Sequence, residues 1–446
     1  MAQESAPPLR VAVVGGGIAG LTAALAILHH IAQGANLSLQ VFEAAEKFAE
    51  IGAGVAFGCA LQSLGDMGEK LTESRSTSPN AQRALRLIGV GDALDSVAGP
   101  AGDDPDTWFE FRVGNNGENA GKAFTTLTGK DAARGSVHRA DFLDQLIKKL
   151  PPDLAHFHHR AVSYTPHSSG VTIHFQQQDA KDVDADVLIC SDGIKSQLRA
   201  HMYQRKGLDM ASQKARYAEW IAWRGLISKA KFHEVFGESA NDKMMHVGTK
   251  AHILVGFVRD EEHKKLGDHN GPWSEPRPAS EMLDDYAHFN DDCKALLRAI
   301  DNPSIWGIFA LPALEVAVDD RTVLIGDAAH ATTPHQGAGA GQAVEDSLFL
   351  AAILAHPSVA SAPLSSRSAA IDRALSVYQT ERHPRAKKVQ TTSHEAGMLY
   401  EFLDPQAGSD LDKIKVNLDS RMKWIWEFDT EAEIKRMLQL LETGDR

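Results

Sequence analysis

The order of apolar and polar positions near the start of the chain predicts a strand, a turn, a helix and a second strand. Residues 9–14, Leu-Arg-Val-Ala-Val-Val, form the short apolar run that is typical of a buried parallel strand. A glycine-rich turn follows at 15–20, and residues 21–28 have the composition of a helix. The run 37–43, Leu-Ser-Leu-Gln-Val-Phe-Glu, then predicts a second strand that ends on an acidic residue.

Two later apolar runs have the same character and end on aspartate and glycine. Residues 185–189 precede Asp192-Gly193, and residues 321–325 precede Gly326-Asp327. Both runs are short and apolar, so we expect them to be two more strands.

The rest of the chain follows two other patterns. Residues 215–310 alternate polar and apolar positions, which favours a half-exposed mixed or antiparallel sheet. From Gln342 onward the pattern is mostly helical, and Arg421 to Leu441 is expected to form one terminal amphipathic helix. No internal repeat is present.

Composition places the chain among ordinary globular proteins. Its 446 residues suggest two or three domains, and 43% hydrophobic with 24% charged residues is enough for a large core. The three cysteines, Cys59, Cys190 and Cys293, are widely spaced and form no CxxC pair. They are expected to be reduced thiols and to form neither a disulfide framework nor a zinc site.

The net charge, the first residues and the lengths of the apolar runs limit which partners and which location are expected. A net charge of −13 without a long basic run argues against nucleic acid and against anionic membranes. The first eight residues are polar and no apolar run reaches about 18 residues, so we expect neither a secretory signal nor a membrane span. The expected location is cytoplasmic, no metal is expected, and a monomer and a homodimer both stay open.

The first glycine turn has the spacing of a dinucleotide-binding motif. Gly15 permits a tight turn, Gly17 lets the backbone approach a pyrophosphate, and Gly20 allows close helix packing. Glu43 closes the second strand, where its carboxylate can accept hydrogen bonds from ribose hydroxyls. The alternative is a structural glycine turn without a ligand. The motif alone leaves NAD and FAD both open.

The two later motifs carry a resemblance that selects FAD. The segment 186–199, with Asp192, resembles the Asp-Gly motif of the single-component flavoprotein aromatic hydroxylases, the para-hydroxybenzoate hydroxylase type of monooxygenase. The segment 326–342 resembles the second FAD motif of that family. The resemblance implies that Asp327 accepts hydrogen bonds from the ribityl chain, or else caps the next helix. It also implies that backbone N–H groups around Gly339, Ala340 and Gly341 close on the flavin.

Other segments resemble the salicylate hydroxylase branch of the family, so that the likeness covers nearly the whole chain. At 138–142 the family's helix-opening segment includes Arg139, which the resemblance assigns to FAD and which is otherwise an exposed arginine. Ala56, in the glycine-containing stretch 52–58, is assigned to FAD as well. The C-terminal likeness rests on the segments 382–385, 389–393, 399–401 and 424–426.

The substrate side of the site rests on a second set of residues. His335, preceded by Pro334, lies between the Gly-Asp strand and the glycine loop, where it can contact a carboxylate or phenolate or remove a phenol proton. Most histidines are structural or exposed, and that alternative stays open. By resemblance Met245 and His252 lie on adjacent strands over the substrate; otherwise they are a core methionine and an exposed histidine. Arg224 can hold an anion, or serve nicotinamide or structure.

Together these observations predict an α/β fold: a Rossmann-like FAD-binding domain, a mixed β-sheet substrate domain and a helical C-terminal segment. The FAD domain is expected to combine residues 1–205 and 313–400, the substrate sheet to span 206–312, and the terminal segment 401–446. The resemblance implies FAD as the bound cofactor, with NADH or NADPH and O2 as co-substrates. The sequence does not choose between the two nicotinamides.

The resemblance implies hydroxylation of a small phenolic acid through a C4a-hydroperoxyflavin, with salicylate converted to catechol and CO2 as the leading reaction. Alternatives within the class are a hydroxynicotinate, a hydroxybenzoate, or dearomatising attack on a resorcylic aldehyde. Alternatives outside it are a flavin dehydrogenase or reductase and a non-catalytic flavin-binding protein.

One stretch departs from the family pattern. The family passes almost directly from the glycine stretch 52–58 to a helix beginning Pro-Asn-Ala, but here residues 59–78 intervene before Pro79-Asn80-Ala81. The stretch is polar and lacks periodicity, so we expect an exposed loop or a translated intron.

Overall fold

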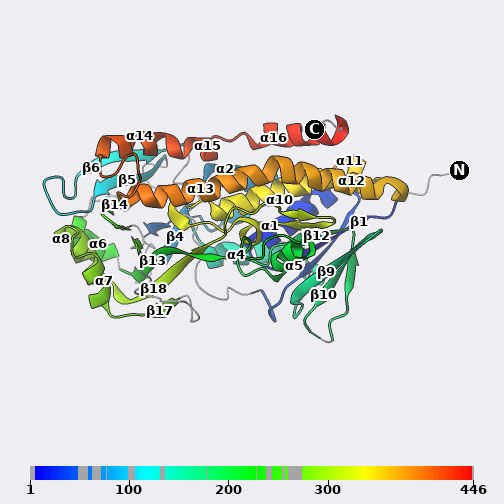
Figure 1. The fold of residues 1–446 in the computed structure, drawn as a ribbon, viewed down its shortest axis with the longest axis horizontal. Helices are drawn as coiled ribbons and strands as arrows, with labels where there is room; N and C mark the ends of the chain where they lie inside the picture. Colours follow the sequence, from blue (N-terminus) through cyan, green and yellow to red (C-terminus); the bar gives the residue numbers. More distant parts are fainter. Residues whose placement is uncertain are drawn as a thin grey trace.

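Two large sheets form the frame of the molecule and occupy opposite ends of its long axis (Figure 1). Long helices run between and along them. The computed structural model describes residues 6–48, 59–62, 72–76, 78–98, 106–130, 136–177, 179–227, 229–237, 244–253, 257–259 and 274–443.

The first sheet has six strands in the order β19-β20-β12-β1-β2-β8. Its strands are β1 Leu9–Val14, β2 Leu37–Phe42, β8 Ala155–His156, β12 Val187–Cys190, β19 Val318–Asp319 and β20 Thr322–Leu324. All neighbours are parallel except β19 and β20. The predicted Rossmann-like unit is confirmed. Because parallel strands end at the same edge of a sheet, the turns after β1, β12 and β20 lie close together there.

Alternate residues of β1 point to opposite faces of this sheet. Val11 and Val13 belong to a hydrophobic cluster with the helices on one face, and Ala12 and Val14 to a second cluster on the other. The first face is covered by α1 Ile18–Ala32, α2 Pro79–Leu87, α3 Gly91–Asp95, α4 Arg139–Lys149, α10 Gly339–Ala355 and α12 Leu364–Val377. The second is covered by α5 Gln197–Arg205 and a small sheet of β9 Ala161–His167, β10 Gly170–Phe175 and β11 Val183–Ala185.

The second sheet has eight strands in the order β17-β18-β13-β16-β15-β14-β5-β6. Its described pairs are antiparallel except β5 with β14, so the sheet is mixed as predicted. Two strands come from the region 107–128, and the predicted range 206–312 therefore does not enclose the whole sheet. The strands are β5 Thr107–Val113, β6 Ala123–Thr128, β13 Arg216–Leu226, β14 Met244–Gly248, β15 Ala251–Ile253, β16 Phe257–Arg259, β17 Ser274–Pro276 and β18 Asp301–Ala310.

The strands β14 and β15 of this sheet are buried on both faces, which corrects the prediction of a half-exposed sheet. Every residue of β14 and β15 is buried. One face packs against α13 His383–Tyr400 and α14 Leu411–Arg421, and the other packs against α6 Lys229–Phe236, α7 Ala279–Asp285 and α8 Asp291–Arg298. The alternation in sequence reflects small and polar residues on a covered face.

The C-terminal part is helical, as predicted, and runs along the molecule (Figure 1). A π-helical turn, η3 Tyr378–Arg382, leads into α13 His383–Tyr400, followed by α14 Leu411–Arg421, α15 Lys423–Trp426 and α16 Thr430–Thr443. The single helix expected from Arg421 to Leu441 is wrong. Trp426 packs beside the second sheet and Met437 beside the first, so the chain turns between them. Asp429 accepts a hydrogen bond from the Ala432 N–H (2.9 Å) where α16 begins.

Residues 59–78, which depart from the family pattern, include two strands in their described part. The expectation of a loop is therefore wrong for these strands. Strands β3 Cys59–Gln62 and β4 Thr72–Ser76 pair with each other, and β4 pairs with β7 Ser136–His138. Residues 63–71 and 77 lie outside the described residues. The remaining short elements are η1 Pro152–Leu154, α9 Asp327–His330, η2 Pro334–Gln336 and α11 Pro357–Ala360.

Candidate cofactor and substrate site

The turn after β1 requires glycine at two of its three motif positions. Gly15 has a φ of +105°, and a Cβ there would lie 2.4 Å from the Ser191 carbonyl oxygen of the neighbouring strand end. A Cβ on Gly20 would lie 1.8 Å from the Gly15 carbonyl oxygen. Gly15 thus makes the tight turn and Gly20 the close contact between turn and helix, as the motif predicts.

Gly17 is different, because a Cβ there would meet nothing within 4 Å. Gly17 is the N-cap residue of α1, and no side chain caps this helix end. The first N–H groups of α1 therefore face an open space with the partial positive charge of a helix N-terminus. This arrangement fits a pyrophosphate.

Glu43 supports the same turn from the end of β2. Its carboxylate accepts hydrogen bonds from the Gly16 N–H (2.6 Å) and from the Ala45 N–H (2.8 Å). The predicted contact with a ribose hydroxyl stays a prediction. What the structure adds is that Glu43 joins the glycine turn to the end of the second strand.

The Asp192 side chain hydrogen-bonds the residues that begin the next helix, α5. Its carboxylate accepts hydrogen bonds from the Ser196 hydroxyl (2.6 Å) and the Gln197 N–H (3.0 Å). Burial raises the pKa of Asp192 despite these bonds. Nearby, Arg199 donates to the carbonyls of Ile194 (2.6 Å) and Ala328 (3.0 Å), and so ties this turn to the one after β20. Burial lowers the pKa of Arg199 to about 10.

Asp327 follows Gly326, whose φ is +57°, at the start of α9. Burial raises the pKa of Asp327, while the charges of His330, Arg139 and Arg199 oppose that rise. Arg139, the first residue of α4, is therefore electrostatically coupled to this carboxylate. Among the described residues no donor bonds the Asp327 side chain. A desolvated carboxylate in that state fits a ligand with hydroxyl groups.

The glycine loop leads into α10. Gly337 adopts a φ of +58°, Gly339 begins the helix, and the N-cap residue Ala338 offers no capping side chain. A Cβ on Gly341 would lie 3.0 Å from the Ser78 hydroxyl, so this glycine also serves the packing of α10 on α2. Among the described residues no side chain caps this helix start, so the N–H groups of Gly339 and Ala340 suit the expected contact with a flavin edge. Ala56 lies outside the described residues.

His335 lies in η2 directly before this loop and is 4% exposed. Its ring packs edge-on against Trp220 (centroids 4.6 Å apart) and lies 5.4 Å from the ring of His252. The Tyr400 hydroxyl donates to the His335 carbonyl (3.2 Å). A Cβ on Gly397 of α13 would lie 2.6 Å from two atoms of the imidazole, so this glycine makes room for the ring.

Met245 and His252 lie on the adjacent strands β14 and β15, as expected. The register pairs Val247 with His252, which places both, together with Met245, on the face toward α13. His252 is buried, contrary to the alternative of an exposed histidine, and its Nδ1 lies 3.0 Å from a carboxylate oxygen of Glu401. Both side chains are at most 2% exposed.

Arg224 and Pro334 lie at the margin of this cluster. Arg224 is on β13, and its guanidinium lies over the Trp306 ring at 4.7 Å. Pro334 opens the short helix that carries His335. The structure therefore brings His335, His252 and the β13 face together and adds Trp220, Gly397, Tyr400 and Glu401. Tyr400 and Glu401 lie in a segment that carried the family likeness, and Gly397 is an isolated glycine in a helical pattern. Trp220 had no such signal.

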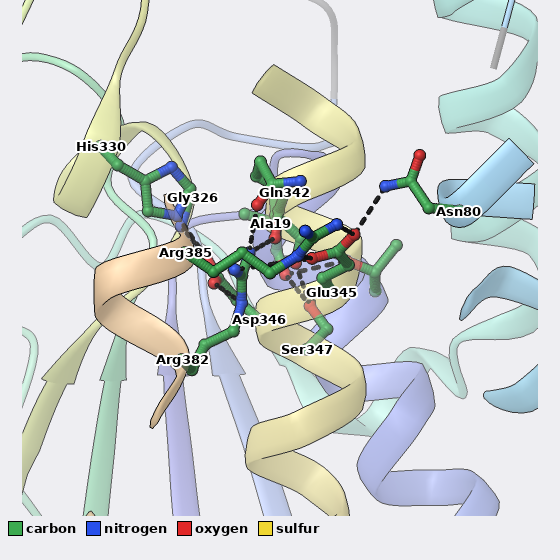
Figure 2. Close-up of polar contacts among 12 residues, drawn as sticks. Ala19, Asn80, Gly326, His330, Gln342, Glu345, Asp346, Ser347, Arg382 and Arg385 are labelled. Carbon is green, nitrogen blue, oxygen red and sulfur yellow. Dashed lines mark hydrogen bonds and ion pairs between the residues drawn. The ribbon is translucent and has the colours of Figure 1, made fainter. Parts of the chain in front are cut away.

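A buried ion-pair network lies on α10 beneath these loops (Figure 2). Glu345 accepts two hydrogen bonds from Arg385 (2.8 and 2.9 Å) and one from Asn80 of α2 (2.6 Å). Asp346 pairs with Arg382 (2.9 Å), and Ser347 bonds Thr22 of α1 (2.9 Å). Arg382 and Arg385 lie in the segment 382–385 that carries the family likeness, but their acidic partners were not predicted, because helix spacing alone does not reveal which charges are buried.

Within the described part of the chain, no group of three or more histidine, cysteine or acidic side chains is arranged to hold a metal. Among the same residues, no helix has both the length and the apolar character that a membrane crossing needs. Cys190 and Cys293 are buried free thiols.

Comparison with known proteins agrees with this geometry. The model of a family described as an FAD binding domain matches residues 149–393. Two salicylate hydroxylases from Pseudomonas putida are 35% and 36% identical, over 96% of this chain and 94% of theirs. A 6-methylsalicylate 1-monooxygenase from Aspergillus terreus is 31% identical, over 96% of this chain and 92% of its own.

Solved structures show the same fold. A salicylate hydroxylase substrate complex superposes with a TM-score of 0.80 at 32% identity, covering 96% of this chain and 98% of the other. A Klebsiella pneumoniae protein complexed with FAD and uric acid shares the fold at 20% identity, with a TM-score of 0.65 and 97% coverage of both chains.

Proposed function

The chain belongs to the FAD-dependent aromatic hydroxylases, a family of monooxygenases, and we propose that within it this chain hydroxylates a small aromatic acid, with salicylate as the substrate. One observation carries the proposal. The buried imidazole of His335, directly before the glycine loop that opens α10, lies 5.4 Å from the buried imidazole of His252 on β15. The likeness to salicylate hydroxylases over 96% of the chain supports the choice of substrate.

FAD is the bound cofactor, and its ligands are proposed as follows. The pyrophosphate lies at the N-terminus of α1, where Gly17 leaves open space. The Asp327 carboxylate accepts hydrogen bonds from the ribityl hydroxyls. The N–H groups of Gly339 and Ala340 bond the flavin edge, and Arg139 balances the charge of Asp327.

The substrate lies between the flavin and the face of β13, β14 and β15. His335 binds the carboxylate or phenolate of the substrate and takes up the phenol proton. The Glu401 carboxylate lies 3.0 Å from His252 Nδ1 and orients the His252 ring beside the substrate. Met245 and Pro334 form apolar walls that exclude water, and Arg224 attracts the anion.

When bound, FAD takes two electrons from NADH or NADPH and activates O2. With salicylate, one oxygen atom enters the ring at the carbon that carries the carboxylate, CO2 leaves, and the second oxygen atom becomes water. The products are catechol, CO2 and the oxidised nicotinamide. The residues of the chain bind and orient the acid, hold its phenol proton and keep water away from the reacting oxygen.

The test is a panel of phenolic acids with three readouts: stimulated oxidation of NADH and of NADPH, product mass, and H2O2. Salicylate should stimulate oxidation and yield catechol and CO2 with little peroxide. Oxidation without substrate dependence would instead indicate a flavin reductase. The A. terreus relative favours 6-methylsalicylate as the second candidate, and a higher kcat/KM with that acid would replace salicylate by it.

A further inference from the structure

Asp346 of α10 contacts the chain on both sides of Asp327. Its Oδ2 accepts hydrogen bonds from the Gly326 N–H (2.9 Å), one residue before Asp327, and from His330 Nε2 (2.6 Å), three residues after it. Its Oδ1 lies 2.9 Å from Nε of Arg382, which emerges from the π-helical turn η3. Figure 2 shows these groups converging on one carboxylate.

Asp346 is ionised in this setting. Burial alone would raise the pKa of its fully buried carboxyl, but His330, Arg382 and the Gly326 N–H outweigh it and lower the pKa to about 2. An ionised carboxylate that accepts hydrogen bonds from a backbone N–H and a histidine fixes both donors strongly. Gly326 has a φ of +57°, one of several conformations open to a glycine, so contacts such as its N–H bond to Asp346 select it.

The neighbouring Glu345 makes a natural comparison. Both acids lie on α10, both are fully buried, and both pair with Arg382. Glu345 otherwise bonds Arg385 and Asn80, and it does not bond the described residues of the turn after β20. Of these two acids, Asp346 is the one that hydrogen-bonds the described turn carrying Asp327, and so connects it with α10, whose N-terminus forms the glycine loop.

We propose that Asp346 is a positioning residue for FAD: it presets the Gly326–Asp327 turn, so that the Asp327 carboxylate is held where the ribityl hydroxyls bind. The proposal rests on the proposed role of Asp327 and is independent of which aromatic acid is hydroxylated. If the turn is already ordered before FAD binds, FAD binding does not have to supply the entropy cost of ordering it. We expect this contribution to FAD affinity from Asp346 and not from every buried charge on α10.

Asp346→Asn and Glu345→Gln separate these effects. Both remove one buried negative charge with little change of shape. The FAD dissociation constant is measured by flavin fluorescence on stripped and reconstituted protein, and thermal unfolding is measured with and without FAD. Asp346→Asn should weaken FAD binding about tenfold to a hundredfold, whereas Glu345→Gln should lower the unfolding temperature and leave FAD binding within about threefold.

The decisive measurement is a double-mutant cycle with Asp327→Ala. If Asp346 acts through Asp327, Asp346→Asn should weaken FAD binding little in the Asp327→Ala background, while Glu345→Gln stays additive. Additive losses for Asp346 and Asp327, or equal losses for Asp346→Asn and Glu345→Gln, would overturn the proposal. Unchanged FAD binding in Asp327→Ala would instead refute the ligand role on which it rests. Should Asp346→Asn not fold, His330→Ala removes one of its contacts and is expected to show the same non-additivity at a smaller magnitude.

Discussion

Gly397 of α13 controls the position of the His335 ring. A methyl group there would lie 2.6 Å from two imidazole atoms, and Trp220 closes the ring in from another side at 4.6 Å between centroids. Alanine in a helix interior is favoured over glycine by about 1 kcal/mol, so Gly397→Ala does not weaken α13 itself. We expect normal FAD content and a salicylate dissociation constant raised at least about tenfold, because the displaced ring loses its substrate contact. Titration of the flavin absorbance with salicylate measures this.

His335→Ala provides the reference for that variant. Losing a hydrogen bond to a charged group costs about 1.5–3 kcal/mol, which is roughly a tenfold to hundredfold weaker affinity or a matching rise in H2O2 per NADH. With the imidazole gone, Gly397→Ala has no ring to displace, so the double variant should bind salicylate as the single His335→Ala variant does. If His335→Ala leaves affinity, catechol yield and peroxide unchanged, the substrate lies elsewhere.

At the scale of single residues, the sequence alone could predict candidate residues for the site, but not which groups surround each of them. Gly15, Gly17 and Gly20 follow from local geometry, which a spacing encodes. The placement of Met245 and His252 on adjacent strands came from resemblance, and their full burial did not follow from the alternating pattern, because a second helical layer covers the sheet. The pairing of His252 with Glu401 joins residues 149 positions apart, which no spacing rule reaches.

The strand–turn–helix element after β1 offers a sharper test, because two of its glycines have opposite surroundings. In Gly17→Ala the methyl group lies within 4 Å of no described residue, and the φ of −77° at this position suits alanine. Apoprotein stability should therefore stay within about 0.5 kcal/mol while FAD affinity falls tenfold or more. In Gly20→Ala the methyl group overlaps the Gly15 carbonyl, so the apoprotein itself should lose at least about 2 kcal/mol.

Urea unfolding of both apoproteins and FAD titration of each give the two quantities. A loss of apoprotein stability in Gly17→Ala, or normal stability in Gly20→Ala, would contradict the assigned turn geometry.

At the scale of elements, strands and helices were predicted correctly where a local sequence pattern determines them. The prediction failed where one segment packs against two different layers of the fold. The strands β1, β2, β12 and β20 were predicted from short apolar runs. The continuous helix expected from Arg421 to Leu441 is divided, because its apolar residues serve two different cores. The entry of β5 and β6 into the second sheet depends on long-range pairing that the sequence pattern does not state.

For the whole molecule, buried histidines predict a loss of stability in mild acid. Burial, with the nearby charge of Arg112, lowers the pKa of His246 to about 4, and burial lowers the pKa of His383 to about 4. The ordinary value in the unfolded chain is about 6.5. Between these values the unfolded chain binds more protons, so the stability is complete above about pH 6.5 and is lost as pH falls toward 4. Each histidine should remove about 2 kcal/mol between pH 7.5 and 5.

Urea unfolding at both pH values tests this with His246→Leu, a position on the face of β14 away from the proposed site. The drop in unfolding free energy should shrink by about 2 kcal/mol in the variant. An equal drop in both proteins would mean that His246 takes up its proton without unfolding.

The contact of α1 with α10 also sets when the protein can fold during its synthesis. The Thr22 hydroxyl bonds Ser347, 325 residues later, and β1 needs β12 as its neighbour. The side of α1 that packs against α10 therefore has no partner until most of the chain has left the ribosome. At a synthesis rate of roughly 5–20 residues per second this interval lasts tens of seconds, during which an apolar helix surface and unpaired strand edges are exposed to solvent. We expect slow maturation, dependence on chaperones, and poor recovery of any fragment that stops before α10.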